Sequence, residues 1–299
     1  MMTAQQSTLR GRLKLNEPMA RHTSWRIGGV AERYYEPADL DDLAQFLETA
    51  VDASEPLLWV GLGSNLLVRD GGVRGTVIMT AGLLNEMSLI DAGVVRIEAG
   101  VSCAKAARFA ARQGLVGAEF LAGIPGTMGG ALAMNAGAFG DETWSHVVAV
   151  ESIDRQGRRH LRQPNEYEVS YRHVAGPANE WFVAAHLTLK SGDAMAATAR
   201  IKELLDRRNA SQPIGQPSCG SVFRNPPGDF SGRLIEASGL KGRCIGGACV
   251  SEKHANFIIN SGNATAAEIE ALIALVITTV AQQHGVSLIP EVHIVGEKR

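Results

Sequence analysis

LAGIPGTMGGALAMNAGAFG, residues 121–140, is the stretch that decides how this chain folds, with six glycines, one proline and no charged side chain. Because each glycine costs about 1 kcal/mol in a helix relative to alanine, only short helical pieces are expected here. The glycines leave backbone N–H groups that a phosphate can approach closely. We therefore expect one wall of a site for a large phosphate-bearing cofactor. The alternative is a small-residue packing loop.

Another glycine loop, GLGSN at residues 61–65, favours the cofactor over the packing loop. In chain order, residues 61–65 are the first glycine loop and residues 121–140 contain the second. It follows an expected buried strand, residues 56–60, as in sites where several N–H donors converge on a pyrophosphate. The loop does not match GxGxxG, and residues 66–70 do not resemble the start of a long helix. A conventional Rossmann unit is therefore disfavoured.

Composition sets the broad class of the protein. The 299 residues are 45% hydrophobic and 20% charged, with a net charge of −2, which predicts about two globular domains. Neither nucleic acid nor membrane insertion is expected from this charge and from the lack of a long apolar run. No two of the four cysteines form a CxxC pair, so we expect reduced thiols in a cytoplasmic protein without structural zinc. The cysteines are Cys103, Cys219, Cys244 and Cys249.

Helical and strand patterns alternate irregularly along the chain, which predicts two small α+β lobes and a C-terminal α+β module. Residues 1–20 lack an apolar signal core and are expected to be an N-terminal lead-in. Helices are expected from an N-cap at Asp39 onward, at 103–113 after an N-cap at Ser102, at 195–209, at 231–238, and at 266–284 after a capping box of Thr265 and Glu268. Strands are expected at 31–37, 76–80, 86–90, 94–99, 147–153, 158–162, 168–173, 182–189, 221–224, 245–250, 256–260 and 291–295, and the strands at 147–153 and 158–162 are expected to form a hairpin across residues 154–157.

Three polar residues stand out in otherwise apolar or turn-rich surroundings. Arg172 follows an aromatic residue in SYRH, where it could face a planar ring or a carboxylate, or simply lie on a strand edge. Ser221 lies in PSCGSVFRNP, beside Cys219, which is either a nucleophile or, more in keeping with the lack of a base, an inert thiol. Glu291 interrupts an apolar strand, and its neighbour His293 has no further ligands at metal-site spacing.

Seven motifs in order resemble the UDP-N-acetylenolpyruvoylglucosamine reductase family, from about residue 20 to the end of the chain. They are TSWRIGG (23–29), GLGSNLLVRDGG (61–72), GIPGTMGGALAMNAGAFG (123–140), SYR (170–172), SCGSVFRNP (218–226), GLKGRCIGGACVSEKHANFIIN (239–260) and PEVHIVG (290–296). The short stretch between Arg172 and Ser221 resembles the family's shorter type, without an extra tyrosine-bearing loop. Met128 stands where other members have valine.

The resemblance implies a two-lobed FAD-binding fold of the vanillyl-alcohol-oxidase (PCMH-like) kind plus a C-terminal α+β substrate domain. The implied divisions are a lead-in at 1–20, lobe 1 at 21–100, lobe 2 at 101–195 and a substrate-binding domain at 200–299. It also implies non-covalent FAD, NADPH as hydride donor and a UDP-sugar substrate. The residues implied to bind FAD are Gly61, Gly63, Ser64, Asn65, Gly126, Thr127, Gly129, Gly130, Asn135 and Gly137.

The implied reaction is reduction of an enolpyruvyl ether, with hydride to C3 and a proton to C2. Arg172 and Glu291 would flank the substrate carboxylate, with the protonation state of Glu291 left open, and Ser221 would donate the proton. Asn225 and Lys241 would bind substrate, although Lys241 could equally be an ordinary surface lysine. A cytoplasmic monomer is expected. The alternatives are an FAD-dependent oxidase of an alcohol or lactone, and a catalytically inactive flavin-binding module.

Overall fold

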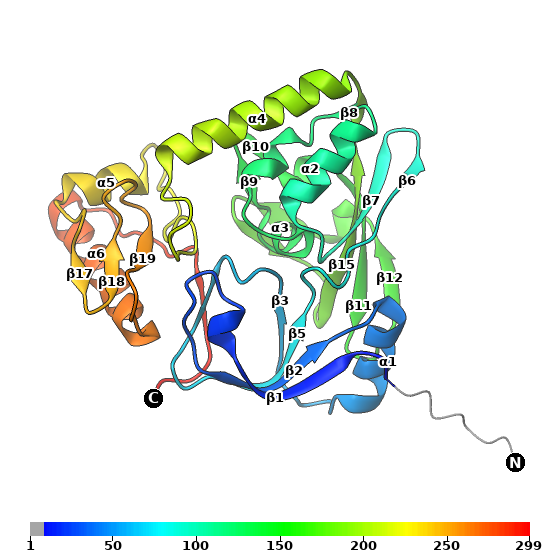
Figure 1. The fold of residues 1–299 in the computed structure, drawn as a ribbon, viewed down its shortest axis with the longest axis horizontal. Helices are drawn as coiled ribbons and strands as arrows, with labels where there is room; N and C mark the ends of the chain where they lie inside the picture. The colour runs from blue at the N-terminus through cyan, green and yellow to red at the C-terminus, as the bar shows by residue number, and fades with distance from the viewer. Residues whose placement is uncertain (1–8) are drawn as a thin grey trace, which may run out of the picture.

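The computed structural model describes residues 9–299, which form two lobes and a C-terminal module (Figure 1). The first lobe is a four-stranded sheet of order β1-β2-β5-β3. Its strands are β1 (Arg12–Pro18), β2 (Val30–Glu36), β3 (Leu57–Val60) and β5 (Val73–Met79). Helix α1 (Leu40–Ala50) follows β2, and the Asp39 side chain accepts the N–H of Asp42, the N-cap that the sequence predicts.

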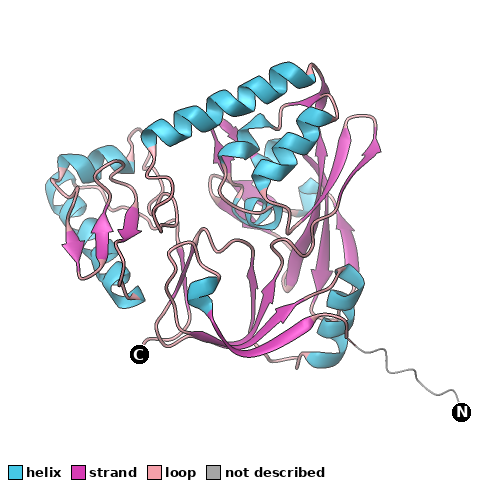
Figure 2. Ribbon diagram, in the orientation of Figure 1, coloured by secondary structure: helices cyan, strands magenta, loops and turns pink. Residues whose placement is uncertain are grey.

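The second lobe is a five-stranded antiparallel sheet of order β12-β11-β15-β7-β6, covered by two helices (Figure 2). Its strands are β6 (Met87–Asp91), β7 (Val94–Glu98), β11 (Val147–Asp154), β12 (Arg159–Arg162) and β15 (Glu180–Thr188). The predicted hairpin across residues 154–157 is confirmed by the β11–β12 pairing. Helix α3 (Met128–Met134), rich in glycine and alanine, packs against β15 and β7, and the alanine-rich α2 (Cys103–Arg112) packs against α3 in the same hydrophobic core.

Short elements fill the second lobe and its borders. Strand pairs are β8 (Leu115–Val116) with β16 (Lys190–Ser191), β9 (Gly137–Ala138) with β10 (Asp141–Glu142), and β13 (Glu168–Ser170) with β14 (His173–Ala175). The 3-10 turns are η1 (Met19–Arg21), η2 (Glu119–Gly123), η3 (Thr143–His146) and η4 (Pro164–Glu166). The second glycine stretch therefore folds as a turn, a short helix and a hairpin, as its composition predicts.

Helix α4 (Ala194–Ser211) spans from the second lobe to the C-terminal module (Figure 1). That module contains α5 (Ser231–Ala237), β17 (Cys244–Ile245), β18 (Ala248–Val250), β19 (Ile258–Asn260) and α6 (Ala266–His284). The chain then returns to the first lobe, where β20 (His293–Val295) pairs in parallel with β4 (Leu66–Val68). This pairing places the residues before β20 beside the loop at 61–65.

Helix α6 has 19 residues and, by length and composition alone, is apolar enough to cross a membrane. Its N-terminus has the predicted capping box of Thr265 and Glu268. One face of α6 contributes Ile269, Leu272 and Val276 to the hydrophobic core of the C-terminal module. The helix therefore packs as a core helix of the C-terminal module.

Four sequence expectations are wrong in detail. Residues 12–18 of the expected lead-in form β1, paired with β2; residues 1–8 lie outside the described part. The expected strand 221–224 is a single bridge between Phe223 and Pro290. The segments 168–173 and 245–250 are each parts of tight hairpins, because turns at Tyr171-Arg172 and Gly246-Gly247 interrupt them.

The expectation of four reduced cysteines is also wrong. Cys244 and Cys249 face each other across the β17–β18 hairpin, with Cα atoms 4.1 Å apart, and form a disulfide. The sequence separation of five residues gave no CxxC signal, and only the hairpin register brings the two side chains together. Cys103 and Cys219 are free and buried.

Candidate active site

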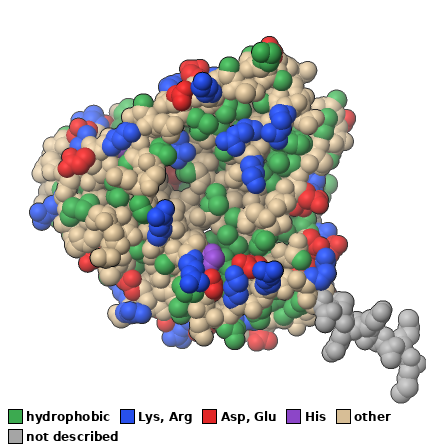
Figure 3. Space-filling view, viewed as in Figure 1, with side chains coloured by type: hydrophobic (Ala, Val, Ile, Leu, Met, Phe, Trp, Pro, Cys, Tyr) green, Lys and Arg blue, Asp and Glu red, His purple; other side chains and the backbone are tan. Residues whose placement is uncertain are grey.

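A cavity of about 640 Å³ lies where the two lobes and the C-terminal module meet. Both glycine loops line it, together with the β13–β14 turn, the end of α4 and the residues around Glu291. Its size falls in the range of about 300–1,000 Å³ typical of ligand sites. On the molecular face in Figure 3, basic and acidic side chains alternate along the lower part, and several basic side chains lie together over α2.

The two glycine loops touch each other at the cavity wall. A Cβ on Gly61 would lie 2.4 Å from the Thr127 hydroxyl oxygen, so glycine is required for this approach. Gly63 has φ +61°, and a Cβ there would lie 2.1 Å from the His22 carbonyl oxygen. Asn65 Nδ2 donates to the Glu291 carbonyl oxygen at 3.0 Å, which connects the first loop to the C-terminal module.

Two glycines of the second loop are better explained by a ligand than by packing. Cβ atoms on Gly126 and Gly130 would meet their nearest neighbours, Ser64 Oγ and Thr127 Oγ1, at 3.6 and 3.8 Å, which is ordinary contact. Both residues line the cavity, so side chains there would occupy ligand space. The bare backbone beside the start of α3 therefore fits a pyrophosphate-bearing cofactor.

Two other residues expected at the cofactor have partners within the protein. A Cβ on Gly129 would lie 2.9 Å from the Ala99 Cβ, so this glycine allows α3 to pack against the end of β7. The Asn135 side chain is buried and donates to the Ser170 carbonyl oxygen and to Glu142. Neither residue lines the cavity, and the expectation that they contact the cofactor is not supported.

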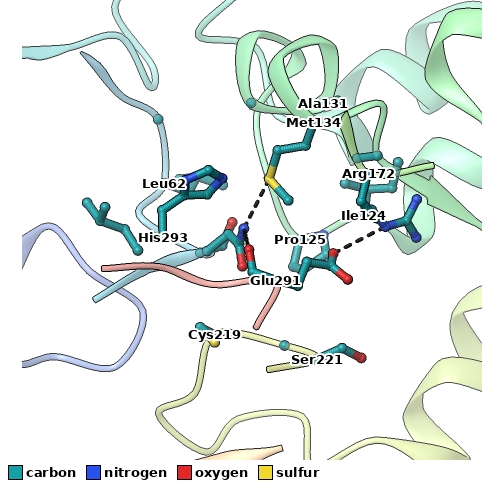
Figure 4. Close-up of a pocket in the computed structure, with 18 of the residues that line it drawn as sticks. Leu62, Ile124, Pro125, Ala131, Met134, Arg172, Cys219, Ser221, Glu291 and His293 are labelled. Carbon is teal, nitrogen blue, oxygen red and sulfur yellow. Dashed lines mark hydrogen bonds and ion pairs between the residues drawn. The ribbon is translucent and has the colours of Figure 1, made fainter. Parts of the chain in front are cut away.

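Arg172 lies at the β13–β14 turn, and its guanidinium is held from several sides. Nη1 donates to the Asn135 carbonyl oxygen and Nη2 to that of Gly137, both at 3.1 Å. Nε donates to Glu291 Oε1 at 3.2 Å (Figure 4). The side chain is 16% exposed, so this cation is fixed in a site with little water.

Glu291, the acidic partner of Arg172 in this ion pair, precedes β20. Burial raises the pKa of the Glu291 carboxyl, and the nearby cations Arg172 and Arg224 act in the opposite direction. The Nε of Arg224 is buried without a hydrogen-bond partner among the described residues. Glu291 is thus a mostly buried carboxyl in contact with Arg172, and desolvation raises its proton affinity.

Ser221 comes from a third element, the segment before the Phe223 bridge, and lines the same cavity. Figure 4 shows Ser221 and Cys219 on one segment across from Glu291 and Arg172. Burial raises the pKa of the Cys219 thiol well above its usual range, with the Glu291 charge adding to the effect. A thiol held in its neutral form is a poor nucleophile, so the inert alternative for Cys219 is favoured.

Most of the predicted site residues are brought together here. The cavity lining includes Gly61, Gly63, Ser64, Asn65, Gly126, Thr127, Gly130, Gly137, Arg172, Ser221, Asn225 and Glu291. Lys241 is not part of the lining, and its Nζ lies 2.7 Å from Glu236 Oε1. Its role as a substrate ligand stays a prediction that rests on resemblance alone.

Sequence reasoning missed two arginines. Arg208, at the end of α4, lines the cavity, and burial lowers its pKa. Arg224 lies close enough to Glu291 and His293 to influence both of their pKa values. The signal for Arg224 was its place between Ser221 and Asn225 in one motif. Arg208 had no signal beyond a basic helix end.

Comparisons with known proteins address the same residues. A family model described as "UDP-N-acetylenolpyruvoylglucosamine reductase, C-terminal domain" matches residues 212–295, and one described as "FAD binding domain" matches residues 31–161. The UDP-N-acetylenolpyruvoylglucosamine reductase of Alkalilimnicola ehrlichii is 62% identical over 297 residues, 99% of each chain. The chain belongs to the UDP-N-acetylenolpyruvoylglucosamine reductase family.

Further family members agree over nearly the whole length. The reductase of Methylococcus capsulatus is 63% identical over 96% of this chain and 94% of its own. The crystal structure of the Thermus caldophilus member is 32% identical and superposes with a TM-score of 0.81, covering 96% of this chain and 99% of that one. The predicted fold class, an FAD-binding fold plus a family-specific C-terminal α+β domain, is confirmed.

Proposed function

We propose that this chain reduces UDP-N-acetylglucosamine enolpyruvate to UDP-N-acetylmuramate with FAD and NADPH, a step in peptidoglycan precursor synthesis. The observation that carries the proposal is the meeting of Arg172, Glu291 and Ser221 at one cavity beside two glycine loops. The three residues come from segments 49 to 119 positions apart, so packing of a single element does not account for their convergence.

FAD, when bound, would transfer a hydride from NADPH to C3 of the enolpyruvyl group. The loops at 61–65 and 124–130 would hold its pyrophosphate on backbone N–H groups, with Ser64 and Thr127 at their edges. Gly126 and Gly130 would keep the space for it open. Glycines and hydroxyls of this kind bind and orient, and they take no part in proton transfer.

Arg172 and Glu291 would act on the substrate carboxylate. Hydride arrival at C3 places negative charge on the carboxylate and C2, and a fixed guanidinium stabilises that charge without reorganising. A protonated Glu291 would donate a hydrogen bond to the same carboxylate. Burial shifts the pKa of Glu291 upward, toward this neutral form, whereas the charge of Arg172 acts toward the ionised form.

Ser221 would deliver the proton to C2. A serine hydroxyl is a weak acid, but an enolate is basic enough to accept its proton. The structure supports this role because Ser221 faces the cavity on the side across from Arg172 and Glu291 (Figure 4). A proton donor needs no adjacent histidine, unlike a serine nucleophile.

The remaining assignments follow the same proposal. Asn225 lines the cavity four residues after Ser221 and would contact the sugar nucleotide. The first lobe would run from about residue 12 to residue 100, the second from 101 to 195 and the substrate-binding domain from 200 to 299. We propose a cytoplasmic monomer, with NADPH preferred as the reductant.

The test is spectroscopic and needs only the purified protein. A flavin absorbance spectrum is expected as purified, with bleaching by NADPH without oxygen and recovery on adding the enolpyruvyl sugar nucleotide. Peroxide formation with an alcohol or lactone, and no recovery with the sugar nucleotide, would instead support the oxidase alternative. A colourless protein that does not take up added FAD would contradict both.

A further inference from the structure

We propose that Asn135 is a positioning residue that fixes Arg172 for its work on the substrate carboxylate. The inference rests on the proposed function and deepens it, because it assigns to one residue of the second glycine stretch a part in the reaction instead of in cofactor binding. Two contacts of Asn135 with the β13–β14 turn carry it, and two more, with Glu142 and Trp144, hold the Asn135 side chain in place.

Arg172 adopts a backbone conformation that arginine rarely takes. Its φ is +55°, in the left-handed region, at the second central position of the turn that joins β13 to β14. Turns of this shape usually place glycine or asparagine there. Such a conformation persists only where the surrounding structure holds it, and it is common at functional sites.

Asn135 supplies such support from outside the hairpin. Its Nδ2 donates to the Ser170 carbonyl oxygen at 3.3 Å, two residues before Arg172. Its own carbonyl oxygen accepts from Arg172 Nη1 at 3.1 Å. One residue therefore contacts both the backbone of the turn and the guanidinium that the turn presents.

The orientation of Asn135 is itself fixed. The residue is 2% exposed and has φ +45° as the left-handed C-cap of α3. Its Nδ2 also donates to Glu142 Oε2 at 2.8 Å, and its Oδ1 accepts the Trp144 N–H at 3.1 Å. Both amide atoms are thus engaged within the protein, which leaves the side chain no hydrogen for a cofactor.

For the reaction, these contacts would align the Arg172 guanidinium with the substrate carboxylate. Catalytic groups lose effect when they are misplaced by about 1 Å, so the support of Arg172 matters as much as its presence. Loss of the Ser170 contact would free the turn while leaving Arg172, Glu291 and the glycine loops in the chain. The guanidinium would then meet the carboxylate less often in the productive geometry.

Asn135→Gly is the variant that isolates the side chain. Glycine adopts φ +45° readily, so the backbone carbonyl that accepts from Arg172 stays in place while the side-chain contacts with Ser170, Glu142 and Trp144 are lost. Asn179→Gly is the matched control, because Asn179 also has a left-handed φ, +58°, but is exposed and does not line the cavity. Asn135→Asp removes the same N–H donors and serves as the second variant if the glycine form fails to fold.

The expected result is a selective loss. With Asn135→Gly, FAD content and the rate of reduction by NADPH stay within about twofold of the unmodified protein. The rate at which the enolpyruvyl substrate reoxidises the reduced enzyme falls about tenfold, and UDP-N-acetylmuramate binds the oxidised protein more weakly by calorimetry. Asn179→Gly changes none of these.

A double-mutant cycle with Arg172→Met separates positioning from general destabilisation. If Asn135 acts through Arg172, adding Asn135→Gly to Arg172→Met lowers the reoxidation rate by less than about twofold. A full tenfold loss in that background, or loss of FAD with normal reoxidation, would overturn the inference. If the unmodified protein itself is not reoxidised by the substrate, the proposed function fails instead.

Discussion

Ser221→Ala is the substitution that tests the proposed proton donor most sharply. The change removes one hydroxyl from a residue that lines the cavity and leaves Arg172 and Glu291 untouched. We expect reduction by NADPH to proceed nearly as before, because that step needs no proton at C2 of the substrate. Reoxidation of the reduced enzyme by the enolpyruvyl substrate should be severely slowed.

The expected magnitude follows from the surroundings of Ser221. Its hydroxyl makes no hydrogen bond within residues 9–299, so its loss should change the free energy of unfolding by less than about 0.5 kcal/mol. Positioned proton donors contribute about 10²- to 10⁴-fold to a rate. A loss in that range, with stability preserved, would be chemical in origin.

The assay is stopped-flow absorbance without oxygen, run separately for the two half-reactions. Ser218→Ala is the matched control, because Ser218 lies three residues earlier on the same segment but does not line the cavity. An equal loss in both half-reactions, or a loss of less than about tenfold in the second, would refute the role assigned to Ser221.

Three further predictions follow from the same geometry. Because burial raises the pKa of Glu291, the contribution of this carboxyl to the free energy of unfolding is complete below its usual pKa and is lost as the pH rises through the raised value. The Glu291→Gln variant stays neutral, so at about pH 8 it should unfold at a higher urea concentration than the unmodified protein, whereas near pH 4 it should not. The same substitution should slow reoxidation of the reduced enzyme by substrate. If the difference in urea midpoint between Glu291→Gln and the unmodified protein is the same at about pH 8 as near pH 4, the raised pKa of Glu291 is contradicted. Gly126→Ala should lower FAD content because its Cβ fills the cradle, and normal FAD affinity by fluorescence titration would show that the cradle lies elsewhere. Reducing the Cys244–Cys249 disulfide should lower the free energy of unfolding by about 2 kcal/mol, because the disulfide closes a short loop. The KM for the substrate should not change. A large change in KM would show that this hairpin shapes the substrate site.

Local signals in the sequence predicted local structure well. The caps at Asp39, Ser102 and Thr265 use side-chain oxygens within three residues of their partners, so the sequence alone contains the whole interaction. The hairpin across 154–157 has the same property. The composition of residues 121–140 predicted a bare backbone wall, which the structure places along the cavity.

What the sequence could not supply depends on pairing over long distances. β1 carries the charged residues Arg12, Lys14 and Glu17, and only its pairing with β2 shows that this part of the lead-in is an edge strand. Asn135 was grouped with its glycine neighbours because its contacts with Ser170 and Trp144 arise from the tertiary fold. The resemblance named the catalytic trio, whereas the raised pKa of Glu291 required its burial to be known.

The central claim is that the cavity reduces an enolpyruvyl sugar nucleotide by way of bound FAD. The most direct measurement is an anaerobic titration of the NADPH-reduced protein with UDP-N-acetylglucosamine enolpyruvate, followed by flavin absorbance and by mass analysis of the product. The account predicts full recovery of the oxidised spectrum with about one equivalent of substrate, and one UDP-N-acetylmuramate per FAD. A reduced protein that recovers only when oxygen is admitted would contradict it.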